Sequence, residues 1–499
     1  MLFTSFSFAV FLFLVFFLYW FLFRENSTYQ NLFLLFCSYL FYGWWDWRFL
    51  VILFAISFSN YFLAILIQKS EKRHLRKIFF LISLTISIGT LVVFKYFSFF
   101  INGFINIFSL FGFHLDQVSV SLILPIGISF YTFLTISYII EVYQKKIIAE
   151  KNIFQVMLAF SFFPIILAGP IQRPNSMLPQ IKNPRIFNAG MATDGLKQIL
   201  WGVFMKILIA DRCDQSVNAI FSNSNHSSGS TLLLGVFLFT IQIYADFSGY
   251  SNIAIGVAKL LGFKIMKNFG YPYFARDIRE FWQRWNISLT SWFRDYVFLP
   301  VAYYVSGKIK SEKIYFIKTE FIIYLTGILV TWTLTGLWHG ANYTFIIWGM
   351  IHGFFLVIYH VTVKPRKSLF KRYKISNNNS LLIFFESVIT FGIIMFSWIF
   401  FRADNIGQAF HYISQIFSAS LLSVPHFSGK KATLITLGII AVAFAMEWAE
   451  RKNDYALSSL GARWPRAMRW GLYYCLVIAI LVSTLSFSGS QQQFIYFQF

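Results

Sequence analysis

Long apolar runs recur from one end of this chain to the other and constrain its fold more than any other feature. A helix that crosses a bilayer needs about 20 mostly apolar residues. The candidate runs lie at 5–23, 31–45, 49–67, 78–100, 119–140, 196–220, 231–262, 314–335, 340–362, 380–401, 432–448 and 470–487. Charged residues make up only 12% of the 499 positions, whereas a soluble domain carries about 25%. So few charges exclude a soluble enzyme, a disordered chain and a secreted disulfide scaffold. We therefore expect an all-α polytopic membrane protein with about 10–12 transmembrane helices.

Two stretches depart from this simple pattern. Residues 153–170 contain Pro164 and end in Gly169-Pro170. Irregular backbone at membrane depth must be buried in protein or line a cavity, so we expect a re-entrant segment there. The longest polar stretch, roughly 263–312, is rich in aromatic and arginine residues, which favours helices at the membrane interface over a linker.

No internal repeat and no soluble part is visible in the sequence, which predicts a single integral-membrane domain over 1–499. Within it we distinguish N-terminal helices at 1–150, a motif-bearing core at 151–403 and C-terminal helices at 404–499.

The net charge of +22 lies mostly between the apolar runs, which favours cytoplasmic loops and lipid headgroups over nucleic acid. Residues 101–117 and 221–230 contain no Lys or Arg, so the positive-inside rule places them outside. The rule places four basic stretches in the cytoplasm: Lys69–Lys77, Lys145–Lys151, Lys264–Lys310 and Lys364–Lys374. This alternation requires that 153–170 does not cross, and it puts both termini outside.

The three cysteines, Cys37, Cys213 and Cys475, have no partner at metal or disulfide spacing, and we interpret them as buried thiols. The apolar segment Phe6–Phe23 lacks a basic start and a small-residue cleavage site, which favours a retained first helix over a signal peptide.

Two of the eight histidines lie inside apolar sequence. His339 follows Trp338 in the segment 335–342, and His352 lies in 348–353. An ionisable residue at membrane depth is costly and suggests a function. The alternative is that both pack between helices and bond a neighbouring carbonyl. Their spacing of thirteen residues does not suit a metal pair, and no HExxH-like or carboxylate-rich set exists, so we assign no metal.

A buried imidazole can accept the proton of a hydroxyl, which suits a general base for acyl transfer to an alcohol. The sequence contains no GxSxG elbow, and no Ser-His-Asp set can be nominated from spacing. The chemistry that fits best is direct attack of an acceptor hydroxyl on a thioester with His339 as base. A covalent acyl-enzyme remains open.

Asp246 interrupts a long apolar run, and a buried carboxylate needs a partner. We expect a structural ion pair with an arginine such as Arg276, Arg284 or Arg294, in preference to direct catalysis.

The segments 272–276, 281–290 and 292–296 interleave aromatic and basic residues at helical spacing. The arginines of these segments, Arg276, Arg284 and Arg294, suit the phosphates of a nucleotide-bearing donor. Contact with lipid headgroups is the alternative for each of them.

Taken together, these clusters resemble the membrane-bound O-acyltransferase family, and within it the alginate O-acetylation proteins of bacteria. The matching pieces appear in the expected order along nearly the whole chain. They are 124–133, 163–164 with 168–173, Asp246–Tyr250, Phe281–Tyr296, Leu337–Asn342, Trp348–Gly353, Trp398–Ala403 and the ending 494–499.

The resemblance implies a ring of tilted helices around a thinned centre, where a funnel from one side meets a tunnel from the other. It puts the essential histidine at His339. The second motif position, often His in the alginate-type proteins, is Asn286 here. An amide can orient an acceptor or a carbonyl but cannot shuttle a proton, which argues against a two-histidine relay.

The resemblance also implies the substrates. The donor would be a cytoplasmic acyl-CoA such as acetyl-CoA, or an acylated carrier protein. The acceptor would be a cell-surface polysaccharide, or a periplasmic or extracellular partner acyltransferase, served from the bacterial cytoplasmic membrane. Residues expected to bind donor or acceptor are Arg284, Trp285, Arg294, Trp338, Asn342, Asp246 and His352.

Two alternatives remain. A transporter or flippase of a lipid-linked sugar would also have broken helices and intramembrane charges, but we find neither two-half symmetry nor spaced intramembrane carboxylates. Within acyl transfer, the chain could instead modify a lipid or a protein, because acceptor choice depends on funnel shape and partner surface.

Overall fold

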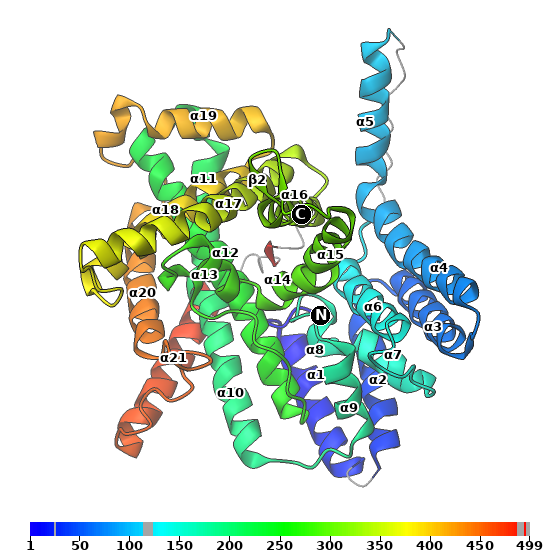
Figure 1. The fold of residues 1–499 in the computed structure, drawn as a ribbon. Coiled ribbons are helices and arrows are strands. Elements are labelled where there is room, and N and C mark those ends of the chain that lie inside the picture. Colours follow the sequence, from blue (N-terminus) through cyan, green and yellow to red (C-terminus); the bar gives the residue numbers. More distant parts are fainter. Residues whose placement is uncertain (24–25, 113–122, 487–493, 496–499) are drawn as a thin grey trace. The chain divides into compact units, whose positions relative to one another are not determined.

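The computed structural model describes residues 1–23, 26–112, 123–486 and 494–495 (Figure 1). These residues form helices almost throughout, which confirms the expected all-α class. Across the described residues, the single sheet is a two-stranded antiparallel ribbon of β1 (Lys313–Ile314) and β2 (Ile317–Lys318). The expected segments 113–117, 119–122 and 496–499 lie outside the described part of the chain.

Eight helices in the described ranges are long and apolar enough to cross a membrane. They are Arg48–Lys69, Arg73–Ser109, Gly229–Leu260, Thr319–His339, Tyr343–Arg372, Ser380–Arg402, Lys430–Ala449 and Arg466–Leu485. Phe6–Leu22 and Ile128–Tyr143 are shorter apolar helices. The polytopic membrane class is therefore confirmed, while the ring with its funnel and tunnel stays a prediction.

The chain divides into two compact units, each described by itself. Unit 1 comprises Met1–Ile199 and Ile253–Met266, and unit 2 comprises Leu200–Asn252 and Lys267–Phe499. The single-domain organisation expected from the sequence stays a prediction.

Helices of unit 1 include the short pair expected to be re-entrant. Here α7 (Ile153–Ser161) and α8 (Phe163–Ile166) are too short to cross a bilayer. Gly127 precedes α6 with φ +77°, and a Cβ there would lie 2.3 Å from the Ile166 carbonyl oxygen. A glycine is thus required where α8 packs on the start of α6. The remaining helices are α1 (Phe6–Phe17), α2 (Ser27–Gly43), α3 (Arg48–Lys69), α4 (Arg73–Leu91), α5 (Phe97–Leu110), α6 (Ile128–Tyr143) and α9 (Pro174–Lys182).

Unit 2 carries every candidate site residue. Helices α10 (Ala189–Phe204) and α12 (Gly229–Leu260) begin or end in unit 1. The others are α11 (Asp211–Ser222), α13 (Ile278–Arg284), α14 (Ile287–Phe293), α15 (Leu299–Lys308), α16 (Thr319–His339), α17 (Tyr343–Arg372), α18 (Ser380–Arg402), α19 (Ile406–Ile416), α20 (Lys430–Ala449) and α21 (Arg466–Ser486). One-turn π segments, at Met205–Ala210 and Arg294–Phe298, join α10 to α11 and α14 to α15.

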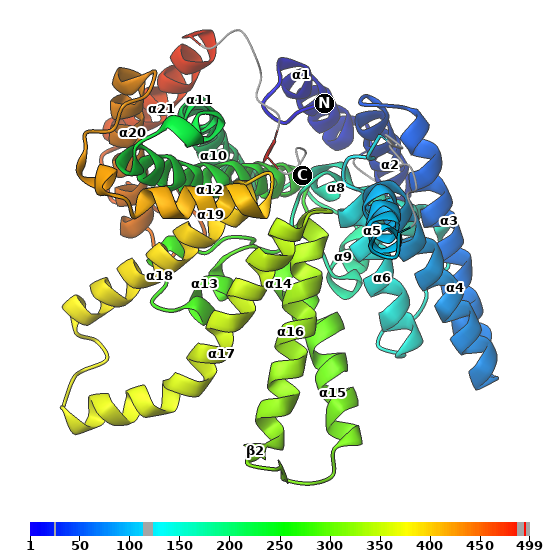
Figure 2. The same cartoon turned by 90° about the horizontal axis from the view of Figure 1, so that it is seen from above.

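Glycines bring α16 and α17 into close contact. A Cβ on Gly336 would lie 2.3 Å from the Phe345 carbonyl oxygen, and one on Gly349 would lie 2.2 Å from that of Trp332. Small residues at such positions let membrane helices approach backbone to backbone. The two helices run side by side near the turn that joins them (Figure 2). This hairpin places His339, the last residue of α16, against the first turns of α17.

One of the three cysteines departs from expectation. Cys37 and Cys213 are buried, but Cys475 is exposed. It lies on α21, a helix that is long and apolar enough to cross a membrane. A position inside an apolar run therefore did not imply that the thiol is buried in protein.

Candidate active site

His339 lies inside a shell of aromatic rings from three helices. Its side chain is 5% exposed. Its ring centroid lies 4.7 Å from that of Trp338, 4.9 Å from that of Trp348 on α17 and 5.0 Å from that of Phe401 on α18. The ring therefore faces other helices of unit 2, and Trp338, a sequence-predicted site residue, touches it.

Asn286 lies between the short helices α13 and α14 with φ +41°. Among residues with a side chain, Asn is one of the few that tolerates this left-handed conformation. Its carbonyl accepts from the Thr290 amide at 2.9 Å, whereas its side-chain amide makes no hydrogen bond to a described residue. The left-handed backbone conformation alone accounts for an asparagine at this position. The side-chain amide is therefore available to bind another group.

Two ring contacts connect the neighbour of Asn286 with the shell of His339. Trp285 is fully buried and packs on Trp398 with 5.2 Å between ring centroids. Trp398 in turn stacks on Trp348 at 5.6 Å. The structure thus brings Trp285 into the same aromatic cluster as His339. That the Asn286 amide acts together with the His339 ring remains a prediction.

His352 continues the cluster along α17. It is completely buried, and its ring lies 4.8 Å from that of Trp348. The Trp282 indole donates to His352 Nδ1 at 3.3 Å. The sequence analysis offered, as an alternative to function, a packed histidine bonded to a neighbouring carbonyl. In the structure the recorded hydrogen-bond partner of His352 is instead the indole N–H of Trp282.

Asn342 serves the backbone. Its Oδ1 accepts from the Thr344 amide at 3.0 Å as the N-cap of α17, and its Nδ2 donates to the Asp404 carbonyl at 2.8 Å. Both ends of the amide are occupied, so the side chain is held by the turn that also positions His339.

The three arginines expected to meet phosphates all have carboxylate partners. Arg276 pairs with Glu386 at 2.8 Å, Arg284 pairs with Glu280, and the largely exposed Arg294 pairs with Asp295 at 2.8 Å. Pairing lowers the positive charge that each can offer a ligand.

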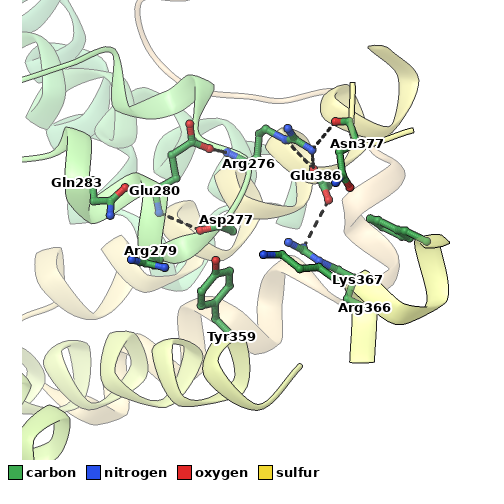
Figure 3. Close-up of a pocket in the computed structure, with 11 residues that line it drawn as sticks. Arg276, Asp277, Arg279, Glu280, Gln283, Tyr359, Arg366, Lys367, Asn377 and Glu386 are labelled. Carbon is green, nitrogen blue, oxygen red and sulfur yellow. Dashed lines mark hydrogen bonds and ion pairs between the residues drawn. The ribbon is translucent and has the colours of Figure 1, made fainter. Parts of the chain in front are cut away.

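A cavity of about 480 Å³ beside α13 offers other cations (Figure 3). Arg279 and Lys367 line it and have no acidic partner among the described residues, and Tyr359 lies beside Arg279. The remaining lining residues are Arg276, Asp277, Glu280, Gln283, Arg366, Phe370, Asn377 and Glu386. Sequence reasoning missed this cavity, although the basic stretch that holds Lys367 was visible.

Asp246 is buried and paired, as expected, but not with an arginine. The Lys206 ammonium lies 2.8 Å from its Oδ1 and also 2.8 Å from the Asp211 carboxylate. The Ile495 amide donates to the other oxygen of Asp246 at 2.7 Å. The expected arginine partners are corrected to Lys206, a lysine inside the apolar run 196–220.

In the ranges that the structure covers, no three His, Cys, Asp or Glu side chains lie together as metal ligands would. Metal-independent chemistry stays a prediction.

Comparison with known proteins adds independent findings. A profile of the membrane-bound O-acyltransferase family matches residues 150–401. The chain is 32% identical to a probable alginate O-acetylase of Pseudomonas aeruginosa, covering 84% of this chain and 76% of that protein. It is 31% identical to a probable alginate O-acetylase of Pseudomonas putida, covering 95% and 96%. A peptidoglycan O-acetyltransferase of Helicobacter pylori is 28% identical over 96% of this chain and 93% of its own.

Proposed function

Because this chain belongs to the membrane-bound O-acyltransferase family, we propose that it moves an acetyl group from cytoplasmic acetyl-CoA to a cell-surface hydroxyl. The hydroxyl belongs to a polysaccharide, or to a periplasmic or extracellular partner acyltransferase that passes the group on. The names of the similar proteins support both acetyl and a polysaccharide acceptor. The proposed location is the bacterial cytoplasmic membrane.

One observation carries the proposal: an imidazole buried among rings at the end of a tightly packed helix pair. In the proposed reaction, His339 accepts the proton of the acceptor hydroxyl as its oxygen attacks the thioester carbonyl carbon. The carbon–sulfur bond then breaks, and the proton goes from His339 to the leaving thiolate. The products are an acetyl ester and free coenzyme A.

The side chain proposed to assist His339 is the Asn286 amide, which can orient the acceptor or the carbonyl. Trp285, Trp338 and His352 complete the shell through the ring contacts described above. Asn342 and Asp246 support this region through the backbone and an ion pair, without a direct part in binding.

The donor's phosphates are proposed to bind in the cavity of Arg279 and Lys367. Cations without carboxylate partners favour phosphate oxygens. Lys367 also belongs to the basic stretch 364–374, which the positive-inside rule places in the cytoplasm, where acetyl-CoA is made available. An acylated carrier protein presents a phosphate of the same chemistry and is the second donor to test.

The test uses membranes that contain the protein and radiolabelled acetyl-CoA, analysed for ester-linked acetyl released by mild alkali. We expect ester formation that depends on the protein and disappears with His339→Ala, while the exposed His74→Ala serves as control. Movement of a lipid-linked sugar without ester formation would instead support a flippase. Acetyl found on lipid or protein would correct the acceptor class.

A further inference from the structure

Three buried ring nitrogens next to the His339 shell have no hydrogen-bond partner within the described chain. They are Trp348 Nε1, Trp398 Nε1 and His352 Nε2. All three side chains are completely buried. Such a group costs about 1–3 kcal/mol when it remains unpaired in a protein interior. Because most buried polar groups in native proteins are paired, three neighbouring exceptions call for an explanation.

The three rings form one connected group beside the imidazole. Trp348 contacts His339 at 4.9 Å between centroids, and it contacts Trp398 at 5.6 Å and His352 at 4.8 Å. Trp348 is thus the centre of the group and touches every other member.

Hydrogen bonding identifies His352 Nε2 as a donor. An indole N–H can only donate, so the contact from Trp282 makes His352 Nδ1 an acceptor. A histidine whose Nδ1 accepts carries its proton on Nε2. Since both tryptophans are also donor-only, all three unpartnered groups offer a hydrogen and none offers a lone pair.

A group of this kind suits an oxygen that has lone pairs and no proton of its own. Carbonyl oxygens fit this description. Phosphate is disfavoured because none of the three rings carries a positive charge. The carbonyl of an acyl thioester meets the requirement and must lie next to His339 for the proposed transfer to occur.

We infer that Trp348, Trp398 and His352 form a binding site for the carbonyl oxygen of the acyl thioester, an inference that rests on the proposed function. When the hydroxyl oxygen bonds to the carbonyl carbon, the π electrons of the C=O bond move to this oxygen. The three N–H groups stabilise the resulting negative charge. The electrons return as the carbon–sulfur bond breaks. Donors fixed in place before the reaction are the most effective form of such stabilisation.

Trp282 acts as a positioning residue in this arrangement. Its indole holds the His352 proton on Nε2 and packs against both His352 and Trp332, at 4.9 Å and 4.5 Å. It contributes to the site through His352, without contact to the thioester.

The decisive variants are Trp348→Phe and Trp398→Phe, which remove an N–H and keep an aromatic ring. Trp201→Phe is the matched control, because Trp201 is equally buried in unit 2 and lies outside the cluster. We expect each site variant to lower kcat by about a hundredfold with little change in KM for acetyl-CoA. The control should retain wild-type kcat.

Infrared spectroscopy then separates hydrogen bonding from packing. Acetyl-CoA labelled with ¹³C at the carbonyl is bound to His339→Ala in the absence of acceptor, so that it is not consumed during the measurement. We expect the carbonyl stretch to move to lower frequency on binding, and Trp348→Phe in the same background to return it towards the free value.

Either of two results would overturn the inference: site variants whose kcat falls no more than that of Trp201→Phe, or a bound carbonyl at the frequency of free acetyl-CoA. If wild-type protein forms no acetyl ester at all, the proposed function has failed instead. If the wild-type protein forms the ester and the tryptophan variants keep its kcat, only the inferred carbonyl-binding site is contradicted, and the proposed function stands.

Discussion

Two buried polar regions of unit 2 show opposite ways of placing ionisable groups among apolar helices. Around Asp246, every buried charge has a partner: Lys206 lies between Asp246 and Asp211, and the Ile495 amide completes the set. Around His339, the groups are aromatic rings, and several N–H donors lack a partner among the described residues. The charges of the Asp246 region are compensated within the protein, whereas the N–H groups of Trp348, Trp398 and His352 beside His339 are the ones proposed to bind a ligand.

The difference teaches that burial alone does not mark a site. Asp246 and His339 look alike in sequence, since each is an ionisable residue inside an apolar run. An intramembrane charge is either compensated for stability or kept for chemistry. For Asp246 the Lys206 ammonium and the Ile495 amide supply the compensation, and the following changes test how the two regions differ.

The largest expected effect on stability comes from Asp246→Ala. It leaves the Lys206 ammonium without one of its two carboxylates and the Ile495 amide without its acceptor. Breaking a buried ion pair costs about 3–5 kcal/mol. Thermal unfolding of the purified protein in detergent should show a large drop in midpoint, with the exposed Asp404→Ala as control. If Asp246→Ala is as stable as wild type but no longer transfers the acyl group, Asp246 has a part in the reaction, and the contrast between the two regions is wrong.

The next change tests whether the Asn286 side chain takes part in acyl transfer. Asn286→Gly accepts φ +41° without strain and removes only the amide. We expect acyl transfer to fall by about tenfold or more, with no loss of stability, because an orienting hydrogen bond is lost. Asn286→Ala adds backbone strain of about 1 kcal/mol, which unfolding measurements would detect. Full activity of the glycine variant would mean that the asparagine is present only for the turn.

A smaller effect is expected from the cations of the α13 cavity. Arg279→Gln combined with Lys367→Gln removes two charged donors that form no ion pair with a described carboxylate. Because a hydrogen bond to a charged group is worth about 1.5–3 kcal/mol, KM for acetyl-CoA should rise at least about tenfold while kcat is kept. Steady-state kinetics of reconstituted protein would measure both constants, with the exposed Lys318→Gln as control. An unchanged KM would place the donor elsewhere.

Local sequence was sufficient for the helical class, for the burial of His339 and for its contact with Trp338, because each follows from an apolar run and its immediate neighbours. Local sequence did not identify the partner of Asp246, since Lys206 comes from another helix forty residues away. The same reason hid the unpaired Arg279 and Lys367, which lie on different helices.

Asn342 shows a different limit of the sequence. An asparagine just before an apolar helix is a typical N-cap, yet its place beside His339 favoured a binding role. The structure uses both ends of its amide for the turn. The sequence analysis assigned Asn342 to binding alone, and the hydrogen bonds of the structure reveal its capping role.

The most direct test of the account compares His339→Ala with wild type at equal amounts of folded, membrane-inserted protein. Both acetyl-CoA binding and the rate of ester formation are measured. We predict that the variant binds acetyl-CoA as wild type does and unfolds at the same temperature, while its transfer rate falls by about a thousandfold. A variant that transfers acetyl at the wild-type rate would contradict the account. It would show that the His339 imidazole only packs against its aromatic neighbours and takes no part in acyl transfer.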